Sequence, residues 1–330
     1  MSQFNVGITS VGLAIPEKVL TNAELEKLVD TSDEWITTRT GIRERRIHQG
    51  PTSDLAAQAL RQALHARQMD PNELDVIIVA TSTPDHFFPS TACVTQAKVG
   101  AKRAWCFDLS AACSGFLYAL QVGNQLIRSG TAQRVAVIGA DVMSTIINYK
   151  DRNTCILFGD GGACVLLEPV EGRGIIDMQL YSDGSTSHLL TIPAGGSAQP
   201  VTPEVYAEGR QYVQMNGREV FRMAVTGMNE SCTKILADNK IASADVAWLV
   251  AHQANIRILE ATRERLNLPS ERVYSNLERF GNTTAATIPL CLAELQHAKR
   301  LRKGDLVLLT AFGAGSTWGA GIVEWAYDPE

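Results

Sequence analysis

The stretch DLAAQALRQALHARQMDPNELDVIIVATSTPD, residues 54–85, returns in pattern as EVFRMAVTGMNESCTKILADNKIASADVAWLVAHQAN, residues 219–255. Each stretch contains apolar residues at helical spacing, then a polar turn, an aspartate and a continuously apolar run. Asp75 precedes the apolar run of the first stretch and Asp245 that of the second. A pattern that repeats at this distance predicts a duplicated chain.

The parallel continues beyond both aspartates. In each copy a helix-like segment, a strand-like segment (AWCFDLS, 104–110, and VYSNLERF, 273–280), a turn of small residues, a helix and an apolar strand follow in order. Cys113 lies in the turn AACSG and Asn282 in the turn GNTTAA, so the two residues are expected at equivalent corners. Alternating strands and helices predict an α/β fold with a mostly parallel sheet covered on both faces. We expect two halves, residues 1–172 and 173–330.

Composition excludes several classes of protein. The 330 residues are 45% hydrophobic and 20% charged, with a net charge of -5, which excludes disorder and disfavours a general nucleic-acid binder. No run approaches the roughly 20 apolar residues of a membrane span, and the first residues do not resemble a secretory signal. The seven cysteines include no C-x-x-C pair, which argues against a disulfide scaffold or a metal site. A cytoplasmic protein without membrane or nucleic-acid partners is expected.

Cys113 is the candidate nucleophile. Its small neighbours permit a tight strand-to-helix turn that exposes one side chain, as in a nucleophile elbow. The N-terminus of the following helix is expected to favour the thiolate. The backbone N–H of Cys113 is a candidate donor to a developing oxyanion.

Two further side chains are candidates for the same site. His252 follows the apolar strand AWLVA, and functional groups of α/β sheets gather at such strand ends. Asn282 has no useful pKa, so we expect it to donate a hydrogen bond rather than act as a base. With a neutral His252 N–H it could stabilise an enolate oxygen. The glycine-rich segment 311–321 favours close approach of the backbone to the reacting centre.

These motifs resemble a known family. The segments DTSDEWITTRTGIRERR (30–46), DRNTCILFGDG (151–161), NGREVFRMAV (216–225), HQANIR (252–257), FGNTTAAT (280–287) and FGAGSTWGAG (312–321) occur in order with the Cys113 turn. Together they resemble β-ketoacyl-acyl carrier protein synthase III. The resemblance implies the thiolase-like fold, with duplicated halves in a five-layer αβαβα sandwich, and a homodimer.

The resemblance also implies an activity. Cys113 would take an acyl group from a short acyl-CoA, and His252 and Asn282 would stabilise the enolate left when malonyl-acyl carrier protein loses CO2. The products would be 3-oxoacyl-acyl carrier protein, CoA and CO2, with no cofactor and no metal. The backbone N–H groups of Cys113 and Ala314 would form the oxyanion hole.

Substrate-binding residues follow from the same resemblance. Those implied for CoA and its pantetheine arm are Thr31, Trp35, Arg39, Arg152, Gly217, Phe221, Ala224 and Asn255. Those implied for the acyl pocket are Leu157 and Phe88, the latter reaching across the dimer. Those implied for the acidic carrier protein are Arg222, Gln253, Arg257 and Arg265.

Some positions depart from the family pattern. Ala251 replaces the more usual proline before His252, Glu264 stands where a basic residue is usual, and Ala314 and Ser316 occupy the terminal glycine loop. These changes leave the preferred primer open. Three alternatives also remain open: a condensing enzyme or acyltransferase of secondary metabolism, a Cys-His-Asn hydrolase, and a binding module without catalysis.

Overall fold

A computed structural model describes residues 5–328 and contains two main β-sheets. The first sheet has the spatial order β1-β7-β6-β4-β5. Its strands are β1 (Asn5–Ala14), β4 (Val76–Ala80), β5 (Trp105–Leu109), β6 (Val135–Asp141) and β7 (Gly161–Val170). Strands β5, β4 and β6 run parallel, whereas β7 is antiparallel to both of its neighbours. The apolar sequence of β4 and β6 fits this position because both strands are fully buried.

The second sheet has the spatial order β11-β12-β13-β8. Its strands are β8 (Ile175–Ser182), β11 (Trp248–Ala251), β12 (Leu306–Gly313) and β13 (Thr317–Glu324). Strands β11 and β12 are parallel, and β13 is antiparallel to both neighbours, as β7 is in the first sheet. The two sheets are therefore copies of one arrangement, and the predicted duplication is confirmed.

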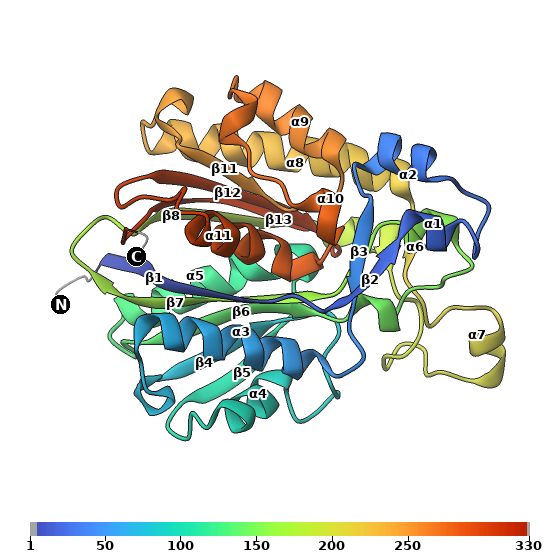
Figure 1. Cartoon of the computed structure of the whole chain (residues 1–330), viewed down its shortest axis with the longest axis horizontal. Helices are drawn as coiled ribbons and strands as arrows, with labels where there is room; N and C mark the ends of the chain where they lie inside the picture. Colours follow the sequence, from blue (N-terminus) through green and yellow to red (C-terminus); the bar gives the residue numbers. More distant parts are fainter. Residues whose placement is uncertain (1–4, 329–330) are drawn as a thin grey trace.

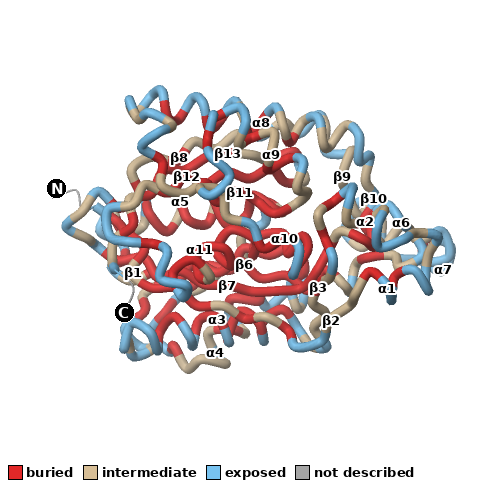
Figure 2. Tube along the Cα trace, turned by 45° about the horizontal axis from the view of Figure 1, so that its top comes forward, coloured by how far each residue is buried: buried red, intermediate tan, exposed pale blue. Residues whose placement is uncertain are grey.

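Helices form three layers around the two sheets (Figure 1). The central layer contains α5 (Gly115–Arg128) and α11 (Thr287–His297), which contact both sheets. The outer layers contain α3 (Thr52–Arg67) and α4 (Thr91–Val99) on the first sheet, and α8 (Gly217–Asp238) and α9 (Ile256–Arg265) on the second. The predicted five-layer αβαβα sandwich is confirmed, and Figure 2 shows buried residues in α11, β6 and β7.

Shorter elements connect these layers. The remaining strands form two small sheets, β2 (Lys18–Thr21) with β3 (Glu44–Ile47) and β9 (Leu190–Thr191) with β10 (Gln214–Met215). The short α-helices are α1 (Asn22–Leu25), α2 (Asp33–Thr40), α6 (Arg152–Cys155), α7 (Pro203–Ala207) and α10 (Leu277–Phe280). The 3-10 turns are η1 (Pro71–Glu73), η2 (Ala112–Ser114), η3 (Met143–Thr145), η4 (Gly184–Leu189), η5 (Ser243–Asp245), η6 (Ser270–Arg272) and η7 (Thr284–Ala286).

One element differs from the sequence expectation. The segment VYSNLERF was expected to be a strand like β5, but it makes only an isolated parallel bridge, between Leu249 and Val273. The helix α10 begins at Leu277. The second sheet thus has one regular strand fewer than the first. The predicted boundary at residues 172 and 173 falls in the turn between β7 and β8, and the treatment of the two halves as separate domains stays a prediction.

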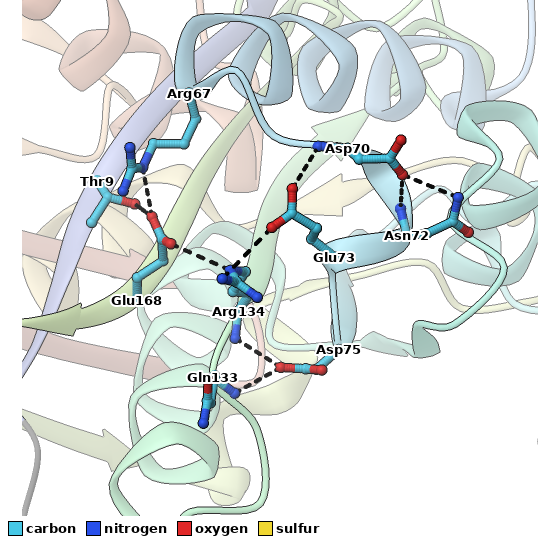
Figure 3. A network of polar contacts seen from close by, with 9 residues as sticks. All are labelled: Thr9, Arg67, Asp70, Asn72, Glu73, Asp75, Gln133, Arg134 and Glu168. Atoms are coloured by element: carbon cyan, nitrogen blue, oxygen red, sulfur yellow. Dashed lines mark hydrogen bonds and ion pairs between the residues drawn. The ribbon is translucent and has the colours of Figure 1, made fainter.

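A polar network joins several elements at one end of the first sheet (Figure 3). Glu168 of β7 is only 9% exposed and accepts a hydrogen bond of 2.6 Å from the Thr9 hydroxyl of β1. Its carboxylate also lies 2.7 Å from Arg67 Nε of α3 and 3.6 Å from Arg134 Nε. Two arginines and a hydroxyl therefore neutralise and solvate a carboxylate that burial would otherwise destabilise.

Candidate active site

Cys113 lies where β5 leads into the central helix α5. It is the middle residue of η2, directly before α5, and it is 7% exposed. Ala112 has φ of 46°, the left-handed conformation that makes the sharp corner. The corner packs against the end of β12, where a Cβ added to Gly313 would lie 2.9 Å from the Cys113 nitrogen. A glycine is therefore required there for the second sheet to approach the thiol.

The protonation state of the thiol differs from the sequence expectation. Burial raises the pKa of the Cys113 thiol to about 12, and the nearby charge of Asp141 adds to this effect. Hydrogen bonds from the Cys113 backbone and from the Asn282 side chain lower it, but by less. The prediction of a thiolate favoured by the helix N-terminus was wrong, because desolvation of the charge outweighs the dipole. The resting nucleophile is a neutral thiol.

Asn282 is held in place by backbone on both sides. Its N–H donates to Leu157 O at 2.8 Å, and its carbonyl accepts from Gly159 N at 3.0 Å. Its side-chain Oδ1 accepts from Thr284 N at 2.9 Å, which leaves the Nδ2 hydrogens for the thiol. The amide thereby directs its N–H groups towards the thiol, and its role as a donor to the substrate stays a prediction.

The corners that carry Cys113 and Asn282 are equivalent, but the two residues are not. Thr284 has φ of 49° and begins η7, just as Ala112 with φ of 46° begins η2. By this alignment the counterpart of Cys113 is Ala285, and Asn282 lies three residues before it. The asparagine therefore approaches the thiol from the turn that precedes the corner and not from its apex.

His252 lies directly after β11, and its side chain is buried and neutral. Its backbone N–H donates to Thr310 O of β12 at 2.8 Å, which continues the pairing of the two parallel strands. Burial lowers the pKa of the imidazole to about 3. His252 Nδ1 lies 2.8 Å from the hydroxyl oxygen of Thr287, the first residue of α11.

The Thr287 hydroxyl determines which imidazole nitrogen carries the proton. That hydroxyl also lies 2.9 Å from Thr284 O, which can only accept a hydrogen bond. A hydroxyl has one hydrogen, so both contacts are satisfied together only when the hydroxyl donates to Thr284 O and accepts from His252 Nδ1. The resting imidazole then carries its hydrogen on Nδ1 and has a free electron pair on Nε2.

The three predicted catalytic side chains line one cavity of about 100 Å³. The same cavity is lined by five residues predicted for the pantetheine arm and the acyl pocket. They are Leu157, Gly217, Phe221, Ala224 and Asn255. Apolar side chains complete the wall, including Val220, Met228, Ile258 and Phe312. The cavity thus combines an apolar lining with a few convergent polar groups, as small-molecule sites usually do.

The residues predicted for the nucleotide gather around the Trp35 ring, outside this cavity. The guanidinium carbon of Arg152 lies 5.0 Å from the ring centroid, and that of Arg39 lies 5.7 Å away. Asn255 joins this group to the cavity, since its Nδ2 donates to Arg39 O at 3.0 Å. Thr31 has a buried hydroxyl oxygen without a hydrogen-bond partner in the described structure.

Phe88 does not reach the cavity of its own chain. Its side chain is 87% exposed beside the equally exposed Phe87, in the loop before α4. Both line a separate surface hollow together with Ile192, Ala194 and Val201. Phe88 therefore does not line this chain's own cavity, and its role in the acyl pocket across a dimer stays a prediction.

Three of the four residues predicted to contact a carrier protein lie on the surface. Arg222 and Arg265 are exposed, and Arg257 lies 5.3 Å from the Phe221 ring at the cavity wall. Gln253 is completely buried, and its amide oxygen accepts from the Ser275 hydroxyl while its nitrogen donates to Ala251 O. The placement of Gln253 on a docking surface was wrong, because the chain turns inward directly after His252.

The terminal glycine-rich turn holds the Cys113 corner through hydrogen bonds. The Ser114 hydroxyl donates to Thr317 O at 2.9 Å, and the Thr317 hydroxyl donates to Ala111 O at 3.1 Å. Ala314 lies in this turn, directly after Gly313. The expected close approach of the segment to the reacting centre is confirmed.

Sequence reasoning missed three supporting residues. Asp141 is fully buried at the end of β6, and it accepts hydrogen bonds from Ser82 N, from Thr83 and from the Thr284 hydroxyl. Arg45 is fully buried and donates to Ile156 O at 2.8 Å, next to the segment that holds Asn282. Thr287 orients His252. Only Asp141 had a signal in the sequence, because it is the aspartate that ends the apolar run VAVIGAD (135–141).

Residues 5–328 lack the side-chain cluster of a metal site and a helix that could span a membrane. They contain no cluster of three or more histidine, cysteine or acidic side chains that could hold a metal ion. None of their helices combines the length and the apolar character that crossing a membrane requires.

Fold and site together define a class of protein. Two stacked copies of one sheet, with a cysteine from the first copy and a histidine and an asparagine from the second, are the features of a condensing enzyme of the thiolase fold. Family models described as 3-oxoacyl-[acyl-carrier-protein] synthase III match residues 107–184, and as its C-terminal part residues 236–325. The chain belongs to the β-ketoacyl-[acyl-carrier-protein] synthase III family.

Relatives support this assignment along the whole chain. A β-ketoacyl-[acyl-carrier-protein] synthase III of Roseiflexus castenholzii is 51% identical over 97% of this chain and 98% of its own. The crystal structure of 3-oxoacyl-[acyl-carrier-protein] synthase III from Aquifex aeolicus matches with a TM-score of 0.90 and 43% identity, over 97% of this chain and 100% of that one. The chain is an acyltransferase-type condensing enzyme of the kind that initiates fatty acid synthesis.

A related enzyme of polyketide synthesis also matches. The priming β-ketosynthase from the R1128 polyketide pathway has a TM-score of 0.92 and 31% identity, over 99% of this chain and 98% of its own. Its identity is lower than that of the Roseiflexus castenholzii and Aquifex aeolicus relatives.

Proposed function

We propose that the enzyme condenses a short acyl-CoA with malonyl-acyl carrier protein in two steps, through an acyl group carried on Cys113. The single observation that supports this most strongly is the cavity shared by a thiol, an imidazole and an amide from two different sheets. No cofactor is needed, because both thioesters are substrates. The dominant requirements are a nucleophile for the first step and two hydrogen-bond donors for the second.

In the first step, Cys113 attacks the thioester carbonyl of the primer. Its thiol is neutral, so a base must take the proton as the new bond forms, and the free electron pair of His252 Nε2 is available for this purpose. The backbone N–H groups of Cys113 and Ala314 hold the carbonyl oxygen. The proton then passes from His252 to the departing CoA sulfur, and the histidine returns to its neutral state.

In the second step, the malonyl group brings a carboxylate into the cavity. This negative charge offsets the desolvation that keeps the imidazole neutral, and His252 takes up one proton on Nε2. His252 and Asn282 then both donate to the enolate oxygen as CO2 departs. The carbanion forms a bond with the acyl carbon, the bond from that carbon to sulfur breaks, and the proton on His252 returns to the Cys113 sulfur. One proton is consumed in each cycle.

The nucleotide end of the primer is proposed to bind at Trp35. The Arg152 guanidinium already stacks on this ring, so an adenine would enter between them and exchange one stacking contact for two. Arg39 and Thr31 would contact the nucleotide end. Gly217, Phe221, Ala224 and Asn255 would line the path of the pantetheine arm to Cys113.

A homodimer is proposed from the exposed aromatic loop. Phe87 and Phe88 expose 86% and 87% of their surface, and apolar groups of this size usually mark an interface. Phe88 of one subunit would then limit the acyl pocket of its partner, with Leu157 on the other wall. Arg222, Arg257 and Arg265 would attract the acidic carrier protein, mainly by increasing its rate of association. A cytoplasmic location fits these partners.

Mass spectrometry of the acyl-enzyme tests the proposal. The protein is incubated with acetyl-CoA and longer acyl-CoA thioesters, and its intact mass is measured before and after malonyl-acyl carrier protein is added. We expect one acyl group per chain, located on Cys113 by peptide mapping, absent in Cys113→Ala and consumed when malonyl-acyl carrier protein is added. An adduct that forms normally in Cys113→Ala, or the absence of 3-oxoacyl product with every primer, would contradict the proposal.

A further inference from the structure

The backbone of Thr284 contacts both side-chain donors of the active site, one directly and one through a third residue. Its N–H donates to Asn282 Oδ1 at 2.9 Å, and its carbonyl oxygen accepts from the Thr287 hydroxyl at 2.9 Å. That hydroxyl in turn accepts from His252 Nδ1 at 2.8 Å. The orientation of the asparagine amide and the tautomer of the histidine therefore both depend on where the backbone of Thr284 lies.

Thr284 has a backbone conformation that threonine rarely adopts. Its φ of 49° lies in the left-handed region, where a side chain branched at Cβ crowds the backbone. Such a conformation persists only when surrounding contacts hold it. Thr284 is 2% exposed, and the one polar group of its side chain, the hydroxyl, donates a hydrogen bond to Asp141 Oδ2. This bond ties the side chain down at the corner.

Asp141 is a fixed anchor for this hydroxyl. It is fully buried at the end of β6, and its other oxygen, Oδ1, is held by the loop that follows β4. The donors to Oδ1 are the Thr81 hydroxyl at 3.1 Å, Ser82 N at 2.7 Å and Thr83 N at 3.1 Å. Hydrogen bonds to a carboxylate are stronger than those to a neutral acceptor, and a carboxylate held on both oxygens cannot turn away. Asp141 therefore connects the first sheet firmly to the corner before α11.

We propose that Asp141 and Thr284 form one positioning unit, which aligns both side-chain donors to the enolate oxygen. The Asp141 carboxylate holds the Thr284 hydroxyl. The backbone at this corner then holds Asn282 directly and His252 through Thr287. Neither member of the unit touches the substrate, because neither lines the cavity. The inference rests on the proposed function, since it concerns the two donors that this function assigns to the enolate.

The first test removes the Thr284 hydroxyl and keeps the shape of the side chain. Thr284→Val cannot donate to Asp141, so the corner is no longer tied to the first sheet. We expect malonyl decarboxylation to slow by roughly 10- to 100-fold, because a small shift of both donors is costly, while KM for malonyl-acyl carrier protein stays unchanged. Thr284→Ser keeps the hydroxyl and should restore the rate. The matched control is Thr262→Val, which removes a buried hydroxyl bound to Ile258 O in α9 and should leave the rate unchanged.

A double-mutant cycle tests whether the two residues act as one unit. Asp141→Asn keeps the shape of the side chain, but it removes the charge and replaces one acceptor oxygen with a donor. We expect Asp141→Asn to slow decarboxylation as Thr284→Val does. The double variant should be no slower than the slower single variant, since both changes break the same link. Effects that multiply would show that the residues act independently and would overturn the inference. If Asp141→Asn does not fold, the Thr284 variants decide alone.

A spectroscopic measurement separates positioning from a general loss of structure, and it needs no substrate. Nitrogen NMR of the labelled imidazole, assigned by its absence in His252→Gln, reports which ring nitrogen carries the hydrogen. We expect the hydrogen on Nδ1 in the wild type and in Thr284→Ser, and a population with the hydrogen on Nε2 in Thr284→Val. A wild-type enzyme that forms no acyl group on Cys113 would refute the proposed function, and the NMR result would still decide the inference. An unchanged tautomer in Thr284→Val, or a decarboxylation rate equal to that of the wild type, would overturn the inference.

Discussion

The Thr287 hydroxyl accepts a hydrogen bond from His252 Nδ1 at 2.8 Å while it donates to Thr284 O at 2.9 Å. This relationship leaves Nε2 of the neutral imidazole without a hydrogen. A histidine in this state can accept the Cys113 proton, whereas a histidine protonated on Nε2 could only donate. The Thr287 hydroxyl at the start of α11 therefore prepares His252 to act as the base in the first step.

Replacing Thr287 separates the two half-reactions. In Thr287→Val, Nδ1 loses its acceptor and the imidazole is free to carry its hydrogen on Nε2, so the rate of acylation at Cys113 should fall about tenfold or more. Decarboxylation of malonyl-acyl carrier protein should fall less. Thr287→Ser keeps the hydroxyl and should restore acylation. Nitrogen NMR of the labelled imidazole reports the tautomer directly, and an unchanged tautomer in Thr287→Val would contradict this explanation.

Removing His252 or Asn282 should slow the decarboxylation of malonyl-acyl carrier protein more than it slows the acylation of Cys113. For Asn282→Ala we expect malonyl decarboxylation to slow by about 10²–10³, equivalent to roughly 2.7–4 kcal/mol in the barrier, because the enolate loses one hydrogen bond. Acylation of Cys113 should continue. His252→Ala should lose decarboxylation and should also acylate more slowly, since the thiol pKa of about 12 requires a base. Single-turnover measurements with each substrate alone distinguish these outcomes, and acylation that fails only in Asn282→Ala would reverse the assignment.

The stability of the protein should depend on pH through His252. The imidazole pKa is about 3 in the folded chain and near 6.5 in the unfolded chain, so between these values only the unfolded state binds the proton. The free energy of unfolding should therefore decrease as the pH falls from 6.5 towards 3, by up to about 1.4 kcal/mol per pH unit from this group. Urea denaturation of wild type and His252→Gln at several pH values isolates the contribution. Equal pH dependence of the two proteins would refute it.

A methyl group at Gly313 should displace the nucleophile. The added Cβ would lie 2.9 Å from Cys113 N and 2.8 Å from Ser114 N, both backbone atoms that cannot move without shifting the corner. A shift of about 1 Å can cost roughly 10²-fold in rate, and we expect a loss of that order in Gly313→Ala. Gly184→Ala is the matched control, because its added Cβ has no neighbour within 4 Å. Full acylation by Gly313→Ala would show that the corner tolerates the shift.

The buried carboxylate of Glu168 should contribute to stability but not to catalysis. Glu168→Gln keeps the shape of the side chain but removes the charge that Arg67 and Arg134 face, so the free energy of unfolding should fall by about 1–3 kcal/mol. The kinetic constants should stay unchanged, since the network lies outside the cavity. The exposed Glu171→Gln serves as control. A loss of activity without a loss of stability would contradict this interpretation.

The repeat, the alternation of strands and helices and the gathering of Cys113, His252 and Asn282 could be predicted, because strand ends and sharp corners have local sequence signals. The burial of Gln253 could not be predicted, because a polar residue directly after the site histidine is expected on the surface. The protonation of Cys113 was also unpredictable from local sequence. Its pKa depends on burial and on Asp141, which is distant along the chain. The missing regular strand at Val273 reflects tertiary context of the same kind, where a bridge and then α10 replace the pairing expected from the repeat.

The neutral state of the buried Cys113 thiol has a consequence for inhibitor chemistry. Haloacetamides react with a thiolate and hardly with a neutral thiol. They should therefore alkylate Cys113 slowly at neutral pH. An inhibitor could instead carry an electrophilic carbonyl whose oxygen binds the backbone N–H groups of Cys113 and Ala314. His252 would then accept the thiol proton as the Cys113 sulfur attacks this carbonyl, so the enzyme itself would activate the sulfur. Selectivity over the other cysteines would then come from mechanism and not from intrinsic reactivity.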